Sequence, residues 1–252
     1  MSSHTPPASS RDSSPASAPS APIPGRIRSL FSAVAPRYDF LNHLLSFGFD
    51  AAWRKTTAKM LQPVLARPGS LVVDLCCGTG DLTVALARHS AGKVIGTDFS
   101  HPMLLLARKK VERKTWPILL LESDSLALPL CDDTVDAITV AFGFRNLADQ
   151  AHGLREMHRV LKPGGTVAIL EFSRVRAPLF GGLFRFYFRH ILPRLGNWIS
   201  GVPGAYSYLH DSVSRFPDQA TLGVALQAAG FGNIRCRNFT GGIAALHTGV
   251  KA

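Results

Sequence analysis

Hydrophobic positions from residue 70 onward fall into two alternating patterns. Short apolar and β-branched runs predict buried strands at 71–75, 93–98, 118–121, 135–142 and 166–172. Apolar residues three or four positions apart predict helices between them, at 81–89, 103–112 and 151–161. Ser100 is a candidate N-cap of the second helix, and a Lys-Pro-Gly-Gly turn at 162–165 ends the third. Strands that alternate with helices indicate βαβ units and a parallel sheet.

The pattern changes near the C-terminus. Residues 218–229 are expected to form a helix that stops at Gly230. Two strands should follow, at 232–239 and 243–250, joined by a short Thr-Gly-Gly turn. Because so short a connection joins antiparallel strands, the sequence predicts an α/β fold whose parallel sheet is closed by an antiparallel strand.

The first 25 residues differ in composition from the rest. They are mostly Ser, Pro and Ala, and the charges of Arg11 and Asp12 cancel. We expect residues 1–25 to form a disordered tail and residues 26–252 to form one domain. The tail lacks the apolar stretch of a secretory signal, and a targeting role in an organelle stays open. No apolar run reaches the roughly 18 residues of a transmembrane helix.

The net charge indicates the kind of partner, and the cysteine content indicates the cellular compartment. The formal net charge of +11 predicts an anionic partner, either nucleic acid, phosphate or an acidic membrane surface, without choosing among them. The four cysteines contain no Cys-x-x-Cys pair, so neither a disulfide scaffold nor a structural metal site is expected. A reducing cytosol fits this cysteine usage.

The turn after the first predicted strand carries the first candidate chemistry. Gly78 and Gly80 let the backbone approach a ligand where a Cβ atom would collide. Thr83 occupies the third glycine position of the dinucleotide fingerprint, which weakens a pyrophosphate site, and no Gly-Lys-Ser/Thr follows to make a P-loop. Asp98 ends the second strand, where a carboxylate can accept the ribose hydroxyls of an adenosine ligand.

Residues 73–81, Val-Asp-Leu-Cys-Cys-Gly-Thr-Gly-Asp, resemble motif I of the class I S-adenosyl-L-methionine (SAM)-dependent methyltransferases. Asp98, Asp124 and the turn at 162–165 follow in that family's order. The resemblance implies a Rossmann-like seven-stranded class I methyltransferase sheet with helices on both faces, and SAM as the cofactor. The expected cofactor-binding residues are Asp74, which would orient the turn through backbone amides, Gly78, Thr79, Gly80, Asp98, Asp124, implied to bind the adenine amino group, and Ser125.

Motifs outside this common fold are more specific. They include Phe-Gly-Phe-Arg-Asn at 142–146, Leu-Glu-Phe-Ser at 170–173, Trp-Arg at 53–54, Tyr-Ser-Tyr-Leu at 206–209 and Leu-His-Thr-Gly at 246–249. Over about residues 27–252, the chain resembles the demethylmenaquinone/ubiquinone-biosynthesis C-methyltransferase family. It departs at Asp124-Ser125, where Asn-Ala is usual, and at Ala141, Ala205 and Asp211, which leaves the substrate-side geometry open.

The resemblance implies methyl transfer to a ring carbon of a prenylated quinol. We favour conversion of demethylmenaquinol to menaquinol, the last step of menaquinone biosynthesis, although no residue decides the head group. Methylation of 2-methoxy-6-polyprenyl-1,4-benzoquinol in ubiquinone biosynthesis stays open. An RNA methyltransferase agrees with the basic charge but lacks a base-modifying motif, and a non-enzymatic binding module would leave the cofactor site idle.

The proposed chemistry requires an electron-rich ring. A quinone cannot attack the electrophilic methyl group of SAM, whereas a quinol can, more strongly if a hydroxyl loses its proton. Arg145 is the first candidate for stabilising that oxyanion, directly or through water, because a guanidinium stays charged when desolvated. Asn146 could orient the substrate or a water, and Tyr206 and His247 are further substrate-side candidates.

A prenylated substrate requires access to a bilayer. Apolar residues between 180 and 191 fall on one helical face, and the stretch 174–194 has five arginines and no acid. This pattern favours a helix at the membrane interface or along a tail-binding channel, and a helix packed on the sheet has the same pattern. We expect a cytoplasmic protein, peripheral at the inner face of the membrane, with no nucleic-acid partner. A homodimer stays open.

Overall fold

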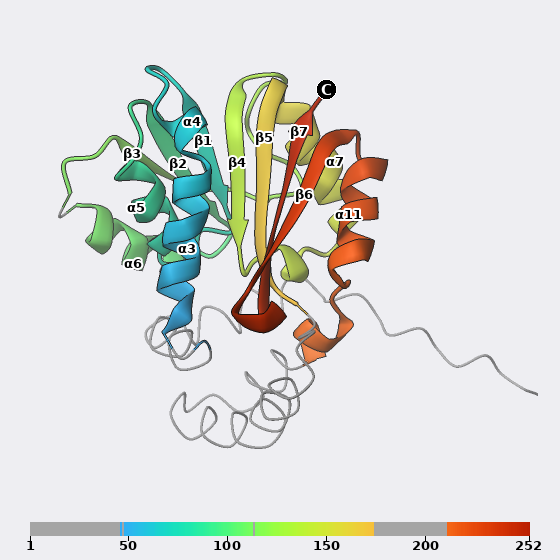
Figure 1. Cartoon of the computed structure of the whole chain (residues 1–252). Coiled ribbons are helices and arrows are strands. Elements are labelled where there is room, and N and C mark those ends of the chain that lie inside the picture. Colours follow the sequence, from blue (N-terminus) through green and yellow to red (C-terminus); the bar gives the residue numbers. More distant parts are fainter. Residues whose placement is uncertain (1–45, 47, 113, 174–210) are drawn as a thin grey trace, which may run out of the picture.

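A seven-stranded mixed sheet forms the centre of the computed structural model, which describes residues 46, 48–112, 114–173 and 211–252 (Figure 1). The strands are β1 (Leu71–Leu75), β2 (Lys93–Asp98), β3 (Ile118–Glu122), β4 (Val135–Ala141), β5 (Leu161–Phe172), β6 (Phe231–Phe239) and β7 (Ala244–Lys251). Their order is β3-β2-β1-β4-β5-β7-β6, and β7 runs antiparallel to both of its neighbours. The predicted Rossmann-like seven-stranded sheet is confirmed.

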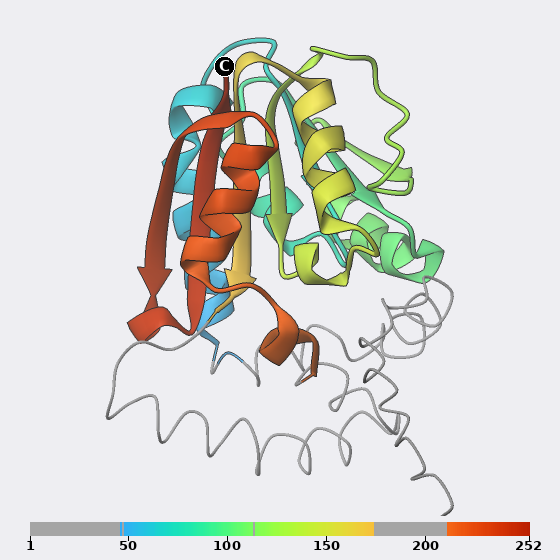
Figure 2. The same cartoon turned by 90° about the vertical axis from the view of Figure 1, so that its right-hand side faces the viewer.

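Helices cover both faces of the sheet, as expected. On one face lie α3 (Phe49–Met60), α4 (Gln62–Leu65) and α5 (Asp81–Ala87), and on the other lie α7 (Gln150–Val160) and α11 (Gln219–Ala228) (Figures 1 and 2). The helix α6 (His101–Val111) contacts α5, β2 and β3. Asp149 and Asp218 cap α7 and α11 by accepting backbone N–H groups, so each of these helices begins one residue after a side-chain acceptor.

The two faces have separate cores because alternate strand residues point to opposite sides. Val72 packs with α3 and α5, whereas its neighbour Val73 packs with α7 and α11. Both residues are fully buried. The continuous apolar runs of the inner strands follow from this two-sided burial.

The structure corrects one predicted turn. Residues 162–165 do not separate α7 from β5 but lie inside β5 as an irregular bulge. Leu161 already pairs with Val135, and the next paired residues are Ala137 and Thr166. Gly164 has a φ of 77°, which lets the extra residues leave the ladder and return. The sequence signal for a turn was therefore real, but the strand continues through it.

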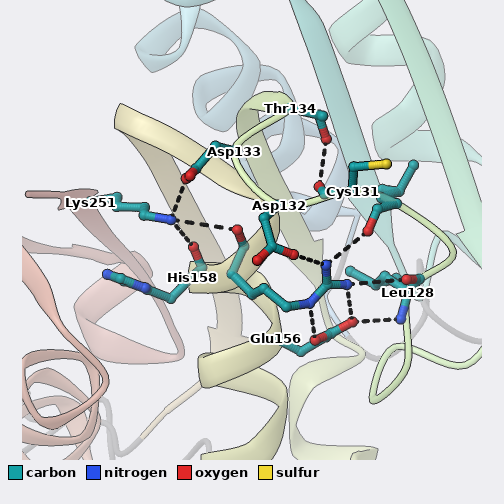
Figure 3. Close-up of polar contacts among 10 residues, drawn as sticks. Leu128, Cys131, Asp132, Asp133, Thr134, Glu156, His158 and Lys251 are labelled. Atoms are coloured by element: carbon teal, nitrogen blue, oxygen red, sulfur yellow. Dashed lines mark hydrogen bonds and ion pairs between the residues drawn. The ribbon is translucent and has the colours of Figure 1, made fainter.

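A polar network joins the end of β7 to the C-terminal turn of α7 and to the loop before β4 (Figure 3). The Lys251 ammonium donates to the carbonyl of His158 at 2.8 Å and to the Asp133 carboxylate at 2.6 Å. These contacts cap the C-terminus of α7 with a positive charge. Nearby, Arg159 bonds Glu156, Asp132 and the carbonyls of Leu128 and Leu130.

Replacing Lys251 by Met should lower the free energy of unfolding by about 1–2 kcal/mol, since the charged cap of α7 and the ion pair with Asp133 are both lost. Urea unfolding monitored by circular dichroism measures the change. Lys162→Met is the matched control, because Lys162 also pairs with an aspartate but its side chain is 43% exposed. The control should lose less than about 1 kcal/mol. Equal losses would contradict a specific capping role.

Some predictions concern residues outside those described. The tail at 1–25, the apolar face between 180 and 191, and Tyr206 all lie there. Among the described residues, no helix is both long and apolar enough to cross a bilayer.

Candidate functional site

The predicted glycine turn joins β1 to α5 at the carboxyl edge of the sheet. Cys76, Gly78 and Gly80 have φ values of 51°, 55° and 84°, so the chain folds back tightly here. The loop after β4 comes close to this turn, because a Cβ atom on Gly143 would lie 2.3 Å from the Cβ atom of Cys76. Only glycine at 143 permits this approach, and the two loops form adjoining walls of one site.

Asp98 lies where the sequence predicted, at the end of β2 beside the turn. Its carboxylate accepts the N–H of Gly78 at 2.8 Å and the N–H of Ser100 at 2.9 Å. The residue is 6% exposed, and burial raises the pKa of its carboxyl group above the ordinary value. The acid is therefore fixed in position, with lone pairs left for further donors.

The carboxylate of Asp74 is bonded by side-chain hydroxyls beneath the glycine turn. Its side chain accepts the hydroxyls of Thr83 at 2.6 Å and Thr139 at 2.7 Å. Because β1 is flanked by α5 and β4, a buried acid on this face meets their side chains first. Asp74 thereby ties β1 to both neighbours beneath the turn. A backbone hydrogen bond from Thr83, at the start of α5, also reaches Asp74, and its role towards the amides of the turn itself stays a prediction.

Burial raises the pKa of Asp74 from 3.8 to about 6, a shift worth about 3 kcal/mol. The folded state therefore binds this proton more tightly than the unfolded chain does, and the wild type loses stability as pH rises from about 4 to 6. The Asp74→Asn variant lacks this loss. Its unfolding free energy, relative to wild type, should rise by up to about 3 kcal/mol across that window and stay constant above it.

Urea unfolding of both proteins at each pH checks this prediction, since titrations elsewhere cancel in the difference. A difference that does not depend on pH would show that Asp74 titrates normally.

Two cavities flank the turn and share Cys76 and Gly78. The first cavity is lined by Arg54, Asp74, Cys76, Cys77, Gly78, Thr79, Asp81, Leu82 and Ala141. The second cavity is lined by Cys76, Gly78, Asp98, Phe99, Met103, Phe142, Gly143 and Asn146. One side is rich in charges, and the other combines a single acid with large apolar side chains. A ligand with one ionic and one flat apolar half fits such a pair.

Some of the predicted cofactor-binding residues line these cavities, and others do not. Thr79 lines the first cavity, and its hydroxyl accepts a hydrogen bond from Lys110 at 2.9 Å. Ser125 is buried with its Oγ 3.5 Å from the Sγ of Cys76, whereas Asp124 is exposed and accepts the N–H of Leu126. Gly80 shapes the turn without lining either cavity.

The cysteines of the turn act as packing residues. Burial raises the pKa of Cys76 to about 12 and that of Cys77 well above its ordinary value. Both thiols are therefore neutral at pH 7, which disfavours nucleophilic or redox chemistry at this turn.

Of the candidate catalytic residues that the structure describes, some lie at the second cavity and one does not. Asn146 lines the second cavity. Arg145 is buried beside it, and its Nη1 bonds the carbonyl of Phe142 and the carboxylate of Glu171 at 3.0 Å. The Arg145 Nε is buried without a hydrogen-bond partner among the described residues. Within the described part of the chain, this guanidinium therefore keeps one buried donor for a further acceptor.

His247 lies away from both cavities. It is 2% exposed in β7, and its Nε2 lies 2.9 Å from the carbonyl of Gln219 at the start of α11. Burial lowers its pKa, so the ring is neutral at pH 7. This placement favours the packed strand histidine over a substrate-side group.

Two charged residues at the cleft were not among the residues predicted from the sequence to form the site. Glu171 belongs to the Leu-Glu-Phe-Ser motif, and an acid near the end of a buried strand indicates a buried partner. Arg54 belongs to the Trp-Arg motif at 53–54, and it lines the first cavity. Trp53 packs against Phe142 and Phe172 and holds α3 over the sheet.

This strand order, with a cleft at the turn after β1, defines a class I methyltransferase fold. A solved SAM-dependent methyltransferase from Thermotoga maritima shares it, with a TM-score of 0.63 over 90% of this chain and 100% of that chain. Its identity of 19% shows the fold alone.

Sequence comparison narrows the class to a family. The profile of the ubiE/COQ5 methyltransferase family matches residues 23–251, and the chain belongs to that family. A demethylmenaquinone methyltransferase from Thermus thermophilus is 46% identical over 223 residues, which cover 88% of this chain and 100% of the relative. The ubiquinone/menaquinone biosynthesis C-methyltransferase UbiE of Geobacter sulfurreducens is 44% identical over 90% of this chain and 88% of the relative. The predicted family and enzyme class are confirmed.

Proposed function

We propose that the protein transfers a methyl group from SAM to a ring carbon of demethylmenaquinol. The observation that carries this proposal is the identity of 46% to a demethylmenaquinone methyltransferase, a match that covers the whole of that relative and 88% of this chain. The UbiE relative favours a benzoquinol of ubiquinone biosynthesis as a second candidate.

The residues of the two cavities fit SAM. Asp98 would accept the ribose hydroxyls, and Phe99 and Met103 offer apolar contacts to the adenine. Asp124 and Ser125 stay candidates for the adenine edge, and Thr79 for the methionine moiety. When bound, SAM supplies an electrophilic methyl group on a sulfonium.

The chain's own task is to place and polarise the quinol. Asn146 lines the second cavity and would hold a ring hydroxyl or a water. Arg145 is fixed by Glu171, and no residue that the structure describes accepts a hydrogen bond from its Nε, which supports stabilisation of a developing phenolate through a bound water. Removing such a stabilising charge from an enzyme costs roughly 100- to 1000-fold in kcat. Tyr206 stays a candidate, and we no longer include His247.

We extend the proposal to the membrane. The quinol carries an isoprenoid tail, so peripheral attachment through the basic stretch 174–194 would bring the enzyme to its substrate. Residues 26–252 would form the methyltransferase domain, and the family match from residue 23 supports that boundary.

Transfer of labelled methyl from SAM tests the function. Demethylmenaquinol, a demethylated 2-methoxy-6-polyprenyl benzoquinol and total RNA serve as parallel acceptors, with and without dithionite. Label in the naphthoquinol only under reduction is expected. Label in the benzoquinol alone would favour the second candidate, and label in RNA or in no acceptor would contradict quinol methylation.

A further inference from the structure

One buried cation in the cleft has no role in the proposed chemistry so far. Arg54 lies in α3, and its side chain is only 9% exposed. It lines the first cavity together with Asp74 and Asp81. A guanidinium retained in so enclosed a place needs anionic partners, because an uncompensated buried charge is costly.

The internal contacts of Arg54 use one side of its guanidinium. Nη1 bonds the carboxylate of Asp50 one helical turn away and lies 3.8 Å from that of Asp81. Ser46 in turn donates to Asp50 at 2.7 Å, and the guanidinium lies 5.4 Å from the centre of the Phe142 ring. No described residue accepts a hydrogen bond from Nε or Nη2 of Arg54. The guanidinium of Arg54 is thus held in place through Nη1, and Nε and Nη2 can donate to a ligand.

The charges of the first cavity complement an amino-acid zwitterion. Arg54 supplies a cation for a carboxylate, and Asp81, whose Oδ1 also accepts from Lys110 at 2.6 Å, supplies an acid for an ammonium group. The second cavity, with Asp98 and apolar side chains, complements a nucleoside instead. Because the two cavities meet at Cys76 and Gly78, one ligand can occupy both.

We propose that Arg54 binds the α-carboxylate of the methionine moiety of SAM and so distinguishes the complete cofactor from nucleosides that lack this group. The inference rests on the proposed use of SAM. Arginine suits this task because its planar fork pairs with a carboxylate through two parallel hydrogen bonds.

Three ligands separate the carboxylate from the rest of the cofactor. S-adenosylhomocysteine has both ionic groups, its decarboxylated analogue keeps only the ammonium, and 5′-methylthioadenosine has neither. Isothermal titration calorimetry measures Kd for each with wild type and with Arg54→Met. The variant should bind S-adenosylhomocysteine roughly 10- to 100-fold more weakly, as expected for a lost charged hydrogen bond. Its affinities for the other two ligands should change less than about threefold.

Control variants keep the test interpretable. Lys55→Met removes the same charge from the exposed side of α3 and should leave all three affinities unchanged. Arg54→Lys keeps the charge but not the fork, and should fall between wild type and Arg54→Met. If Arg54→Met unfolds because Asp50 is left unpaired, the Asp50→Asn/Arg54→Met variant removes both charges and serves in its place.

The outcomes are distinct. Equal weakening of all three ligands would mean that Arg54 only positions α3, and no weakening would mean that it does not contact the ligand. Either result overturns the inference while the proposed function stands. Failure of wild type to bind S-adenosylhomocysteine at all would overturn both.

Discussion

Asp98→Ala is expected to weaken binding of S-adenosylhomocysteine by about 100-fold or more, as measured by isothermal titration calorimetry. The carboxylate would lose its bonds to the ribose hydroxyls, and the turn would lose the acceptor that fixes the N–H of Gly78. Affinity should also fall as pH is lowered towards the raised pKa of Asp98, because protonation removes acceptor strength.

Glu122→Ala is the matched control for this effect. Glu122 pairs in register with Asp98 on the neighbouring strand, but it is exposed and lines neither cavity. Its loss should change the affinity less than about threefold, as for a screened surface charge. Unchanged affinity of Asp98→Ala would remove the ribose assignment, and an equal change in both variants would indicate a general charge effect.

Glu171→Leu is expected to lower the free energy of unfolding by about 3–5 kcal/mol, because it leaves the buried Arg145 without its carboxylate. The Arg145→Met/Glu171→Leu variant should recover most of that loss, since apolar side chains can replace a buried ion pair. Urea unfolding of the three proteins measures both changes.

Turnover then separates the two roles of Arg145. If it stabilises the phenolate, the stable double variant should bind S-adenosylhomocysteine normally but lose roughly 100-fold in kcat. A double variant with wild-type kcat would show that Arg145 only holds the loop after β4. A double variant no more stable than Glu171→Leu would contradict the ion-pair argument itself.

The bounds of the inner strands and the position of the cleft could be predicted, because both depend on local sequence pattern. β1 and β2 begin and end at the predicted residues, because their apolar runs are bounded by a glycine turn and an acid. The cleft beside Gly78 and Asp98 follows from the rule that ligands bind at the carboxyl ends of parallel strands.

Contacts between residues far apart in the sequence could not be predicted from local pattern. Glu171 lies 26 residues from Arg145, and nothing in the spacing indicates that β5 carries the acid to the loop after β4. His247 was expected near the substrate, but the register of β7 between β5 and β6 directs it towards α11. Arg54 precedes the sheet in the sequence, and only the packing of α3 brings it to the cleft.

The position of β7 has a consequence for biosynthesis of the chain. The ribosome makes β6 before β7, yet β6 joins the sheet only by pairing with β7, which lies between it and β5. Until β7 is translated, the edge of β5 is open and β6 has no partner strand. Unpaired edges of this kind invite contacts with other chains. The nascent protein is therefore most vulnerable to aggregation late in translation, when six of its seven strands already exist.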